Sequence, residues 1–131
     1  MRPVSKYPNA LAFCAPSGTG KTTFLCELIK KILLEENRYR AQDIVVLKMS
    51  HHPIQERSQG KDCQKYRDLG IVALATNQIE EAQAFLKKHQ HRICLVEGGR
   101  RLNLPSLVLR RTEISHIGWK RPQRILMVVD L

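Results

Sequence analysis

The stretch Ala15-Pro-Ser-Gly-Thr-Gly-Lys-Thr-Thr23 decides the fold. It fits the phosphate-binding P-loop pattern G-x-x-x-x-G-K-[ST], except that Ala15 stands at the first glycine position. Gly18 and Gly20 allow backbone angles that a side chain would hinder, so successive N–H groups can turn inward around phosphate oxygens. Because this motif joins a buried strand to a helix, it predicts an α/β protein with a phosphate site.

The segments on either side of the loop agree with this interpretation. Residues 10–14 form a short apolar run that predicts a buried strand. Residues 21–36 carry apolar side chains at helical spacing, which predicts a helix. The start of that helix would add free N–H groups and the positive end of its dipole to the phosphate site.

The rest of the chain alternates apolar runs with helical patterns. A short helix is predicted over residues 62–69, and a second helix from Asn77 to about residue 89, with Asn77 and Glu80 as a capping box. Further strands are predicted at residues 44–47, 71–76, 92–96, 107–109 and 125–129. Strands that are apolar on both faces and separated by helices predict a three-layer P-loop fold with a mainly parallel sheet. The length favours one domain over residues 1–131.

Composition and charge limit the class of protein. The chain has 131 residues, and its formal net charge of +10 predicts an anionic partner. No apolar run approaches the roughly 18 residues that a membrane-spanning helix needs, so no membrane partner is expected. The four cysteines form no CxxC pair and have no zinc-like spacing with histidines, which favours reduced thiols in a cytoplasmic protein.

The P-loop assigns roles to particular side chains. Lys21 would contact the β- and γ-phosphates, and the Thr22 hydroxyl would bind Mg²⁺. Glu97 ends an apolar strand and precedes two glycines, so we assign it to Mg²⁺ or its water shell. Asp43 and Asp62 are rivals, but Asp43 precedes its strand, whereas ligands collect at carboxyl ends. The predicted nucleotide-binding residues are Ser17, Gly18, Thr19, Gly20, Lys21, Thr22 and Thr23.

Basic and histidine side chains follow the second predicted strand. Lys48, His51 and His52 would lie at its carboxyl end. Adjacent side chains in an extended segment point to opposite sides, so the two histidines are poorly placed to share one metal ion. This segment has two interpretations: it contacts a phosphate or a partner, or it is a solvated loop.

In series, these segments resemble the family of molybdopterin-guanine dinucleotide biosynthesis protein B, MobB, from about residue 10 to 130. The chain departs from the usual family pattern at Met49, where a histidine is common, and at Gly99, where an aromatic residue is common. The resemblance is carried by the P-loop, Lys48 with His51-His52, Gly60-Lys61-Asp62, Glu97-Gly98-Gly99-Arg100, Leu104-Pro105 and Arg110-Arg111.

The resemblance implies a GTP-binding, Mg²⁺-dependent protein with weak GTPase activity. It implies a homodimer that works beside the MobA-like guanylyltransferase, the enzyme that attaches GMP to molybdopterin, and contact with molybdopterin itself is a further option. Asp130 could contact guanine or could be a plain chain-terminal carboxylate. The residues expected around the pocket are Lys48, His51, His52, Lys61, Asp62, Arg100 and Asp130.

Two other classes of function fit parts of the sequence. A small kinase could transfer phosphate from ATP, with Asp62 or Glu97 beside the acceptor and residues 119–124 as the nearest candidate for a lid. A nucleic-acid binder would explain the positive charge. Its basic residues are dispersed, however, aromatic residues are only 5%, and no recognition motif is present. A nucleic-acid partner is therefore not expected.

Overall fold

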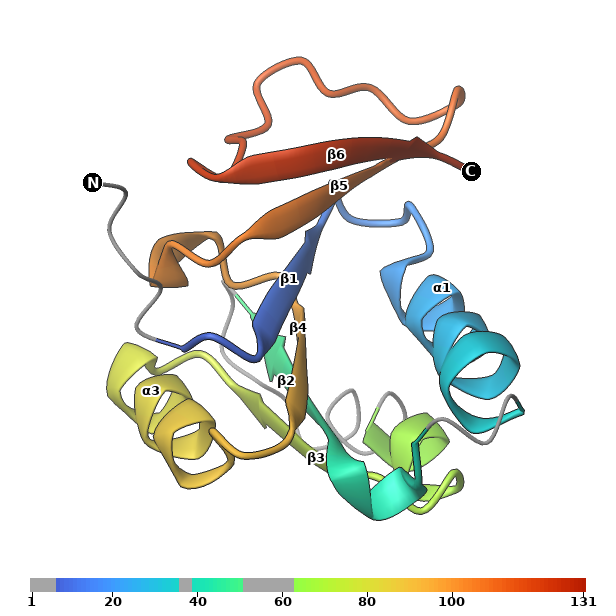
Figure 1. The fold of residues 1–131 in the computed structure, drawn as a ribbon. Helices are drawn as coiled ribbons and strands as arrows, with labels where there is room; N and C mark the ends of the chain where they lie inside the picture. Colours follow the sequence, from blue (N-terminus) through green and yellow to red (C-terminus); the bar gives the residue numbers. More distant parts are fainter. Residues whose placement is uncertain (1–6, 36–38, 51–62) are drawn as a thin grey trace.

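The computed structural model of the chain describes residues 7–35, 39–50 and 63–131. In these residues six strands form one sheet in the order β3-β2-β4-β1-β5-β6, and every neighbouring pair is parallel (Figure 1). The strands are β1 (Ala10–Cys14), β2 (Ile44–Met49), β3 (Val72–Thr76), β4 (Ile93–Glu97), β5 (Ser106–Arg110) and β6 (Ile125–Asp130). The predicted α/β fold with a parallel sheet is confirmed.

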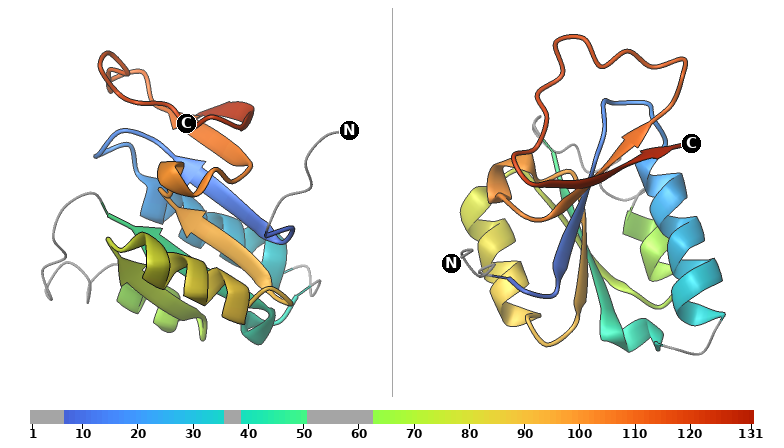
Figure 2. Two further views of the ribbon diagram at one scale, coloured as in Figure 1. Left: turned by 90° about the vertical axis from the view of Figure 1, so that its left-hand side faces the viewer. Right: turned by 45° about the horizontal axis from the view of Figure 1, so that its top comes forward.

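Helices cover both faces of the sheet. Helix α1 (Lys21–Leu28) lies on one face and α3 (Ile79–Lys88) on the other, as the views in Figure 2 show. A short helix over residues 63–67 lies on the α1 face, where Tyr66 joins the same core cluster as α1. Short 3-10 segments occupy Ala41–Asp43 and Arg100–Leu102.

Two helix predictions differ from the structure. The helix expected over residues 21–36 is α-helical only to Leu28 and continues as a π-helix, Ile29–Leu34. There the Glu35 N–H donates to the carbonyl of Lys30, five residues back, at 3.1 Å. Over so few residues, apolar spacing does not separate the two helix types.

The capping box expected at the start of α3 is also wrong. The N-cap of α3 is Gln78, and no side chain caps the helix. The hydroxyl of Thr76, at the end of β3, accepts a hydrogen bond from the Gln78 N–H at 3.1 Å. The helix therefore begins one residue later than predicted, after Gln78 and not after Asn77. The Asn77 side chain accepts a hydrogen bond from the Gln78 side chain.

The alternation of side chains along the strands decides which residues reach α1. On β4, Cys94 and Val96 pack in the core cluster on the α3 face, and Leu95 packs in the cluster on the α1 face. Glu97 is two residues after Leu95, so it faces α1. On β2, Lys48 is two residues after Val46 and takes the same face. The sheet thus presents both charged groups towards the helix that follows the P-loop.

The sheet is covered less completely than the sequence suggests. On β6, at one edge, Leu126 is 65% exposed and Met127 is 59% exposed. On β3, at the other edge, Val72 is 49% exposed. The expectation of strands buried on both faces is met in the centre of the sheet and fails at these edges. In the described part of the chain, no helix is long and apolar enough to span a membrane.

Candidate functional site

The loop between β1 and α1 has the backbone of a phosphate cradle. Gly18 and Gly20 have φ angles of +84° and +98°, a region that side chains rarely adopt. The buried Thr19 hydroxyl donates to the carbonyl of Pro16 at 2.8 Å and closes the loop on itself. Gly20 is the N-cap of α1, and the first turn of this helix carries no acidic side chain. The first N–H groups of α1 therefore have no carboxylate from their own turn to bind.

Lys21 folds back over this loop. Its Nζ donates to the carbonyl oxygen of Ala15 at 3.0 Å. Burial lowers the pKa of Lys21, with a smaller contribution from Lys48, while Glu97 acts in the opposite direction. The positive charge of Lys21 is thus held in a partly desolvated position, where an anion is strongly attracted.

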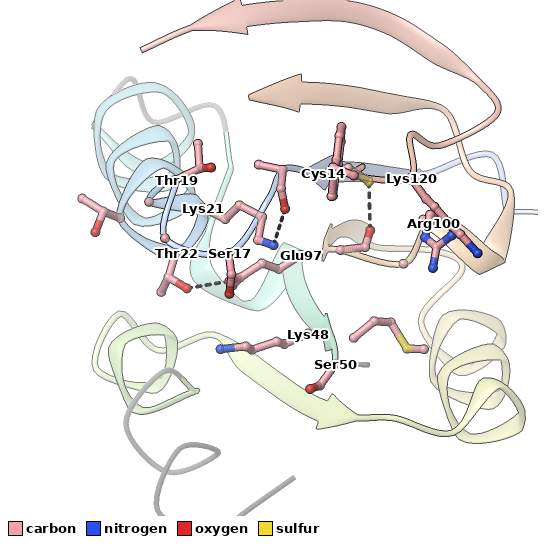
Figure 3. Close-up of a pocket in the computed structure, with 18 residues that line it drawn as sticks. Cys14, Ser17, Thr19, Lys21, Thr22, Lys48, Ser50, Glu97, Arg100 and Lys120 are labelled. Carbon is pink, nitrogen blue, oxygen red and sulfur yellow. Dashed lines mark hydrogen bonds between the residues drawn. The ribbon is translucent and has the colours of Figure 1, made fainter. Parts of the chain in front are cut away.

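Glu97 is a buried carboxylate with a donor on each oxygen. The Thr22 hydroxyl donates to its Oε1 at 2.6 Å (Figure 3), and the Tyr66 phenol donates to its Oε2 at 2.8 Å. Only 4% of Glu97 is exposed. The structure therefore brings together the two residues, Thr22 and Glu97, that the sequence assigns to Mg²⁺.

Tyr66 is a site residue that the sequence analysis missed. It is fully buried on the short helix over residues 63–67. Burial, together with the charge of Glu97, raises the pKa of Tyr66 well above its usual range, so the phenol stays protonated and donates. An aromatic residue in an amphipathic helix is usually core, and nothing in the local sequence indicates a partner 31 positions away.

The turn after Glu97 is fixed by glycine. Gly98 has φ +86°, and a Cβ there would lie 2.9 Å from the carbonyl oxygen of Met49. Its N–H donates to the carbonyl of Phe13 at 2.9 Å, and its carbonyl accepts a hydrogen bond from the Cys14 thiol at 3.4 Å. Both hydrogen bonds hold the turn after Glu97 against β1.

These elements enclose a cavity of about 510 Å³ at the carboxyl ends of β1, β2 and β4 (Figure 3). Lys48 and Glu97 are register partners on adjacent strands, so they line it side by side. Trp119 and Lys120 line it as well, from the segment considered as a lid. Of the predicted residues, the cavity is lined by Ser17, Gly18, Thr19, Gly20, Lys21, Thr22, Thr23, Lys48, Glu97 and Arg100.

Other predicted residues lie elsewhere. Asp130 ends β6 outside this cavity, and its carboxylate accepts two hydrogen bonds from Arg110, at 2.6 and 3.1 Å. These bonds lower the pKa of Asp130. Asp43 precedes β2, as expected, and accepts a hydrogen bond from the Arg40 N–H at 2.9 Å. The residues that fall outside the described part of the chain are His51, His52, Lys61 and Asp62.

The donor set suits a hard divalent cation. Thr22 and Glu97 offer a hydroxyl and a carboxylate, the oxygen ligands that Mg²⁺ prefers. Within residues 7–35, 39–50 and 63–131, no group of three or more His, Cys, Asp or Glu side chains could hold a metal ion. The described residues therefore fit a cation that takes its remaining ligands from phosphates and water, as Mg²⁺ commonly does in nucleotide sites.

Comparison with known proteins agrees with this geometry. The family described as molybdopterin guanine dinucleotide synthesis protein B, MobB, matches residues 10–130. The crystal structure of hydrogenase maturation factor HypB from Archaeoglobus fulgidus is similar to 82% of this chain, with a TM-score of 0.57 and 19% identity. The alignment spans 56% of the HypB chain, and at this identity the likeness concerns the fold alone. No curated protein matches the chain.

Proposed function

The chain belongs to the MobB family of molybdopterin guanine dinucleotide synthesis proteins, and on this premise we propose that it binds GTP with Mg²⁺. We further propose that it hydrolyses GTP slowly and serves as an adaptor to the MobA-like guanylyltransferase. The observation that carries the proposal is the hydrogen bond between Thr22 and Glu97, at 2.6 Å, beside the P-loop lysine. A hydroxyl and a carboxylate placed there have the arrangement that a nucleotide-bound Mg²⁺ requires.

The proposed mechanism is positioning and electrostatics. The N–H groups of the loop and the start of α1 would hold the phosphate oxygens, and Lys21 would neutralise the β–γ region. Mg²⁺ would supply further positive charge at those oxygens. Thr22 and Glu97 would hold the ion, and Tyr66 would keep the Glu97 carboxylate in place.

The cavity supports slow turnover. Among the described residues that line it, Glu97 is the only carboxylate, and no histidine lines it. Both Glu97 oxygens already accept hydrogen bonds, so this carboxylate is poorly placed to activate water. We therefore assign fast chemistry, including guanylyl transfer to molybdopterin, to the partner enzyme.

The basic side chains of the cavity support contact with a second anion. Besides Lys21, the cavity is lined by Lys48, Arg100 and Lys120, and basic side chains suit a phosphate ester such as molybdopterin.

A cytoplasmic location is proposed on separate grounds: all four cysteines are buried and unpaired.

We also propose that the protein is a homodimer, with a second copy paired along β6. In the described residues β6 is an edge strand that pairs with β5, and its apolar side chains are exposed. An open apolar strand edge readily pairs with another strand.

Leu126→Lys is expected to shift the protein to a monomer in analytical ultracentrifugation. Ile117→Lys, at a residue 95% exposed outside the strand, is expected to leave the dimer unchanged. A monomeric wild type, or a dimeric Leu126→Lys protein, contradicts this arrangement.

One observation favours a small-molecule kinase as a second candidate. Lys120, from the segment considered as a lid, lines the same cavity as the P-loop. A phosphoryl acceptor could bind between Lys120 and the γ-phosphate. The cavity offers this acceptor no carboxylate besides Glu97 among the described residues, so the kinase stays second.

Calorimetric titration with GTP and ATP, each with and without Mg²⁺, tests the proposal, and phosphate release is followed afterwards. We expect GTP to bind more tightly than ATP, Mg²⁺ to strengthen binding, and phosphate release to need no added acceptor. Preference for ATP together with transfer to an acceptor would establish the kinase instead. Absence of binding to either nucleotide would reject both functions.

A further inference from the structure

Lys48 is a second lysine on the α1 side of the phosphate cavity. It is the last residue but one of β2, and its register partner on the adjacent strand β4 is Glu97. Register partners on neighbouring parallel strands point to the same face of the sheet, so both side chains face α1. Both also lie at the carboxyl end of the sheet, where ligands of parallel α/β proteins bind. Lys48 therefore lies beside the proposed metal site.

The charge of Lys48 acts within the phosphate site. Burial is the main cause of the lowered pKa of Lys21, Glu97 opposes it, and the charge of Lys48 lowers the pKa further. In Figure 3 the Lys48 amine points towards the side of the cavity that carries Thr22, and away from Arg100. This side therefore holds two lysines and one carboxylate, and it keeps a net positive charge that attracts an anion.

The order of the strands indicates which phosphate Lys48 would meet. Strand β1, which leads into the P-loop, is followed across the sheet by β4 and then by β2. In the proposed complex the P-loop holds the β-phosphate, and Mg²⁺ on Glu97 joins the β- and γ-phosphates. Lys48 comes next in the same direction, beyond Glu97. Because β2 is paired on both edges, with β3 and β4, this lysine is carried on a firmly held strand.

We propose that Lys48 is a catalytic residue of GTP hydrolysis and that its ammonium group donates to the γ-phosphoryl oxygens. The inference rests on the proposed function, because it requires GTP and Mg²⁺ on the P-loop. In the reaction a water oxygen bonds to the γ phosphorus, while the bond from this phosphorus to the β–γ bridging oxygen breaks. The electron pair of that bond stays on GDP, and the proton lost by the water passes to the released phosphate.

Lys48 neither gives nor takes a proton in this reaction. It supplies a fixed positive charge beside the oxygens of the transferred group, in addition to Lys21 and Mg²⁺. This role suits a cavity in which, among the described residues, Glu97 is the only carboxylate. Arg100 and Lys120 remain for the second anion.

Lys48→Met tests the proposal, because it removes the charge and keeps most of the length of the side chain. Single-turnover hydrolysis of GTP, at saturating protein, is expected to slow roughly 100-fold, the effect of removing one preorganised donor. The affinity for GDP with Mg²⁺ is expected to stay the same, because GDP has no γ-phosphate. Lys65→Met, the matched control, removes an exposed lysine outside the cavity, on the helix over residues 63–67, and should change neither quantity.

Aluminium fluoride gives a readout that needs no turnover. Bound with GDP, it takes the place of the γ-phosphoryl group in its transition-state shape, so the wild type should bind GDP more tightly when aluminium fluoride is added. Lys48→Met should lose most of this gain in affinity. Lys48→Arg, which keeps a positive charge, should recover part of the gain and part of the hydrolysis rate.

Wild-type hydrolysis together with a wild-type gain from aluminium fluoride in Lys48→Met would overturn the inference. An equal loss of affinity for GDP and for GDP with aluminium fluoride would also overturn it, because Lys48 would then attract any phosphate. Lys48→Gln, a shorter polar replacement, repeats both measurements and guards against a folding defect of the methionine variant. A wild type that does not bind GTP overturns the proposed function, and the wild-type titration shows this before any variant is compared.

Discussion

The Tyr66 phenol donates to Glu97 Oε2 at 2.8 Å, on the opposite side of the carboxylate from the Thr22 hydroxyl. The three residues come from the helix over residues 63–67, from β4 and from α1. A carboxylate fixed at both oxygens cannot rotate without breaking a hydrogen bond. The proposed metal ligand is thus oriented by the fold before any cation or nucleotide binds.

Tyr66→Phe tests this orientation. The change leaves the buried Oε2 of Glu97 without its donor, which costs about 1–3 kcal/mol of unfolding free energy. We expect a lower denaturation midpoint in urea and a weaker effect of Mg²⁺ on GTP affinity. Tyr39→Phe, at a tyrosine that is 41% exposed, is the matched control and should change neither quantity. A Tyr66→Phe protein with the stability and Mg²⁺ response of the wild type would show that the hydrogen bond is dispensable.

Glu97→Gln separates metal binding from nucleotide binding. The amide keeps the shape of the side chain and removes the charge that attracts the cation. We expect the gain in GTP affinity on adding Mg²⁺ to fall roughly ten-fold or more. Affinity measured in EDTA should stay the same or rise, because one negative charge near the phosphates is lost. Glu81→Gln on the exposed side of α3 serves as the control. Full Mg²⁺ dependence in the Glu97→Gln protein would remove Glu97 from the metal site.

Lys21→Ala should abolish nucleotide binding while the protein stays folded. The lysine side chain donates to the Ala15 carbonyl and belongs to neither core cluster, so its loss leaves the sheet and its core intact. Circular dichroism checks the fold and calorimetry checks GTP binding. Lys87→Ala, which removes an exposed lysine from α3, controls for the change in net charge. Wild-type GTP affinity in a folded Lys21→Ala protein is the contrary outcome.

Alkaline pH should weaken phosphate binding earlier than an ordinary lysine would predict. The pKa of Lys21 is lowered, mainly by burial, so its charge is complete below that pKa and is lost as the pH rises through it. Tripolyphosphate affinity, measured from neutral to alkaline pH, should fall along the same curve. Lys21→Arg keeps its charge over this range, so the tripolyphosphate affinity of this variant should not fall in the same way. A wild-type tripolyphosphate affinity that stays constant up to the pH at which an ordinary lysine loses its charge would contradict the lowered pKa of Lys21.

Gly98→Ala should destabilise the protein more than Gly118→Ala. Both glycines have positive φ angles, +86° and +75°, so both variants carry a backbone strain of roughly 1–2 kcal/mol. Only at Gly98 would the new methyl group meet a backbone atom, the Met49 carbonyl oxygen at 2.9 Å, whereas Gly118 has open space around it. Urea denaturation compares the two. Equal losses would show that the close approach next to Glu97 is easily relaxed.

The sequence allows the fold and the phosphate loop to be predicted because their signals are local. Central strands are apolar on both faces, and the P-loop is a continuous pattern between a strand and a helix. Glu97 could be assigned because the carboxyl ends of parallel strands meet at one edge.

The contacts of Tyr66 and Arg111 could not be predicted, because each depends on a partner far away in the chain, Glu97 and Thr19 respectively. The second half of the α1 segment was predicted as α-helix because hydrophobic spacing alone does not distinguish it from π-helix. The two interpretations of Asp130, a contact with guanine or a plain chain-terminal carboxylate, could not be separated from the sequence. Strand order places Asp130 two strands away from β1, where its carboxylate accepts a hydrogen bond from Arg110.

The exposed edge of β6 also has a consequence for how the protein behaves in concentrated solution. Its apolar side chains favour contact between copies, while a net charge of +10 makes copies repel one another. The repulsion extends about 10 Å at 0.1 M salt and only about 3 Å at 1 M. Ionic strength therefore sets the balance between separate copies and copies paired along β6. Low salt favours separate copies through charge repulsion, and high salt favours contact between the exposed apolar side chains.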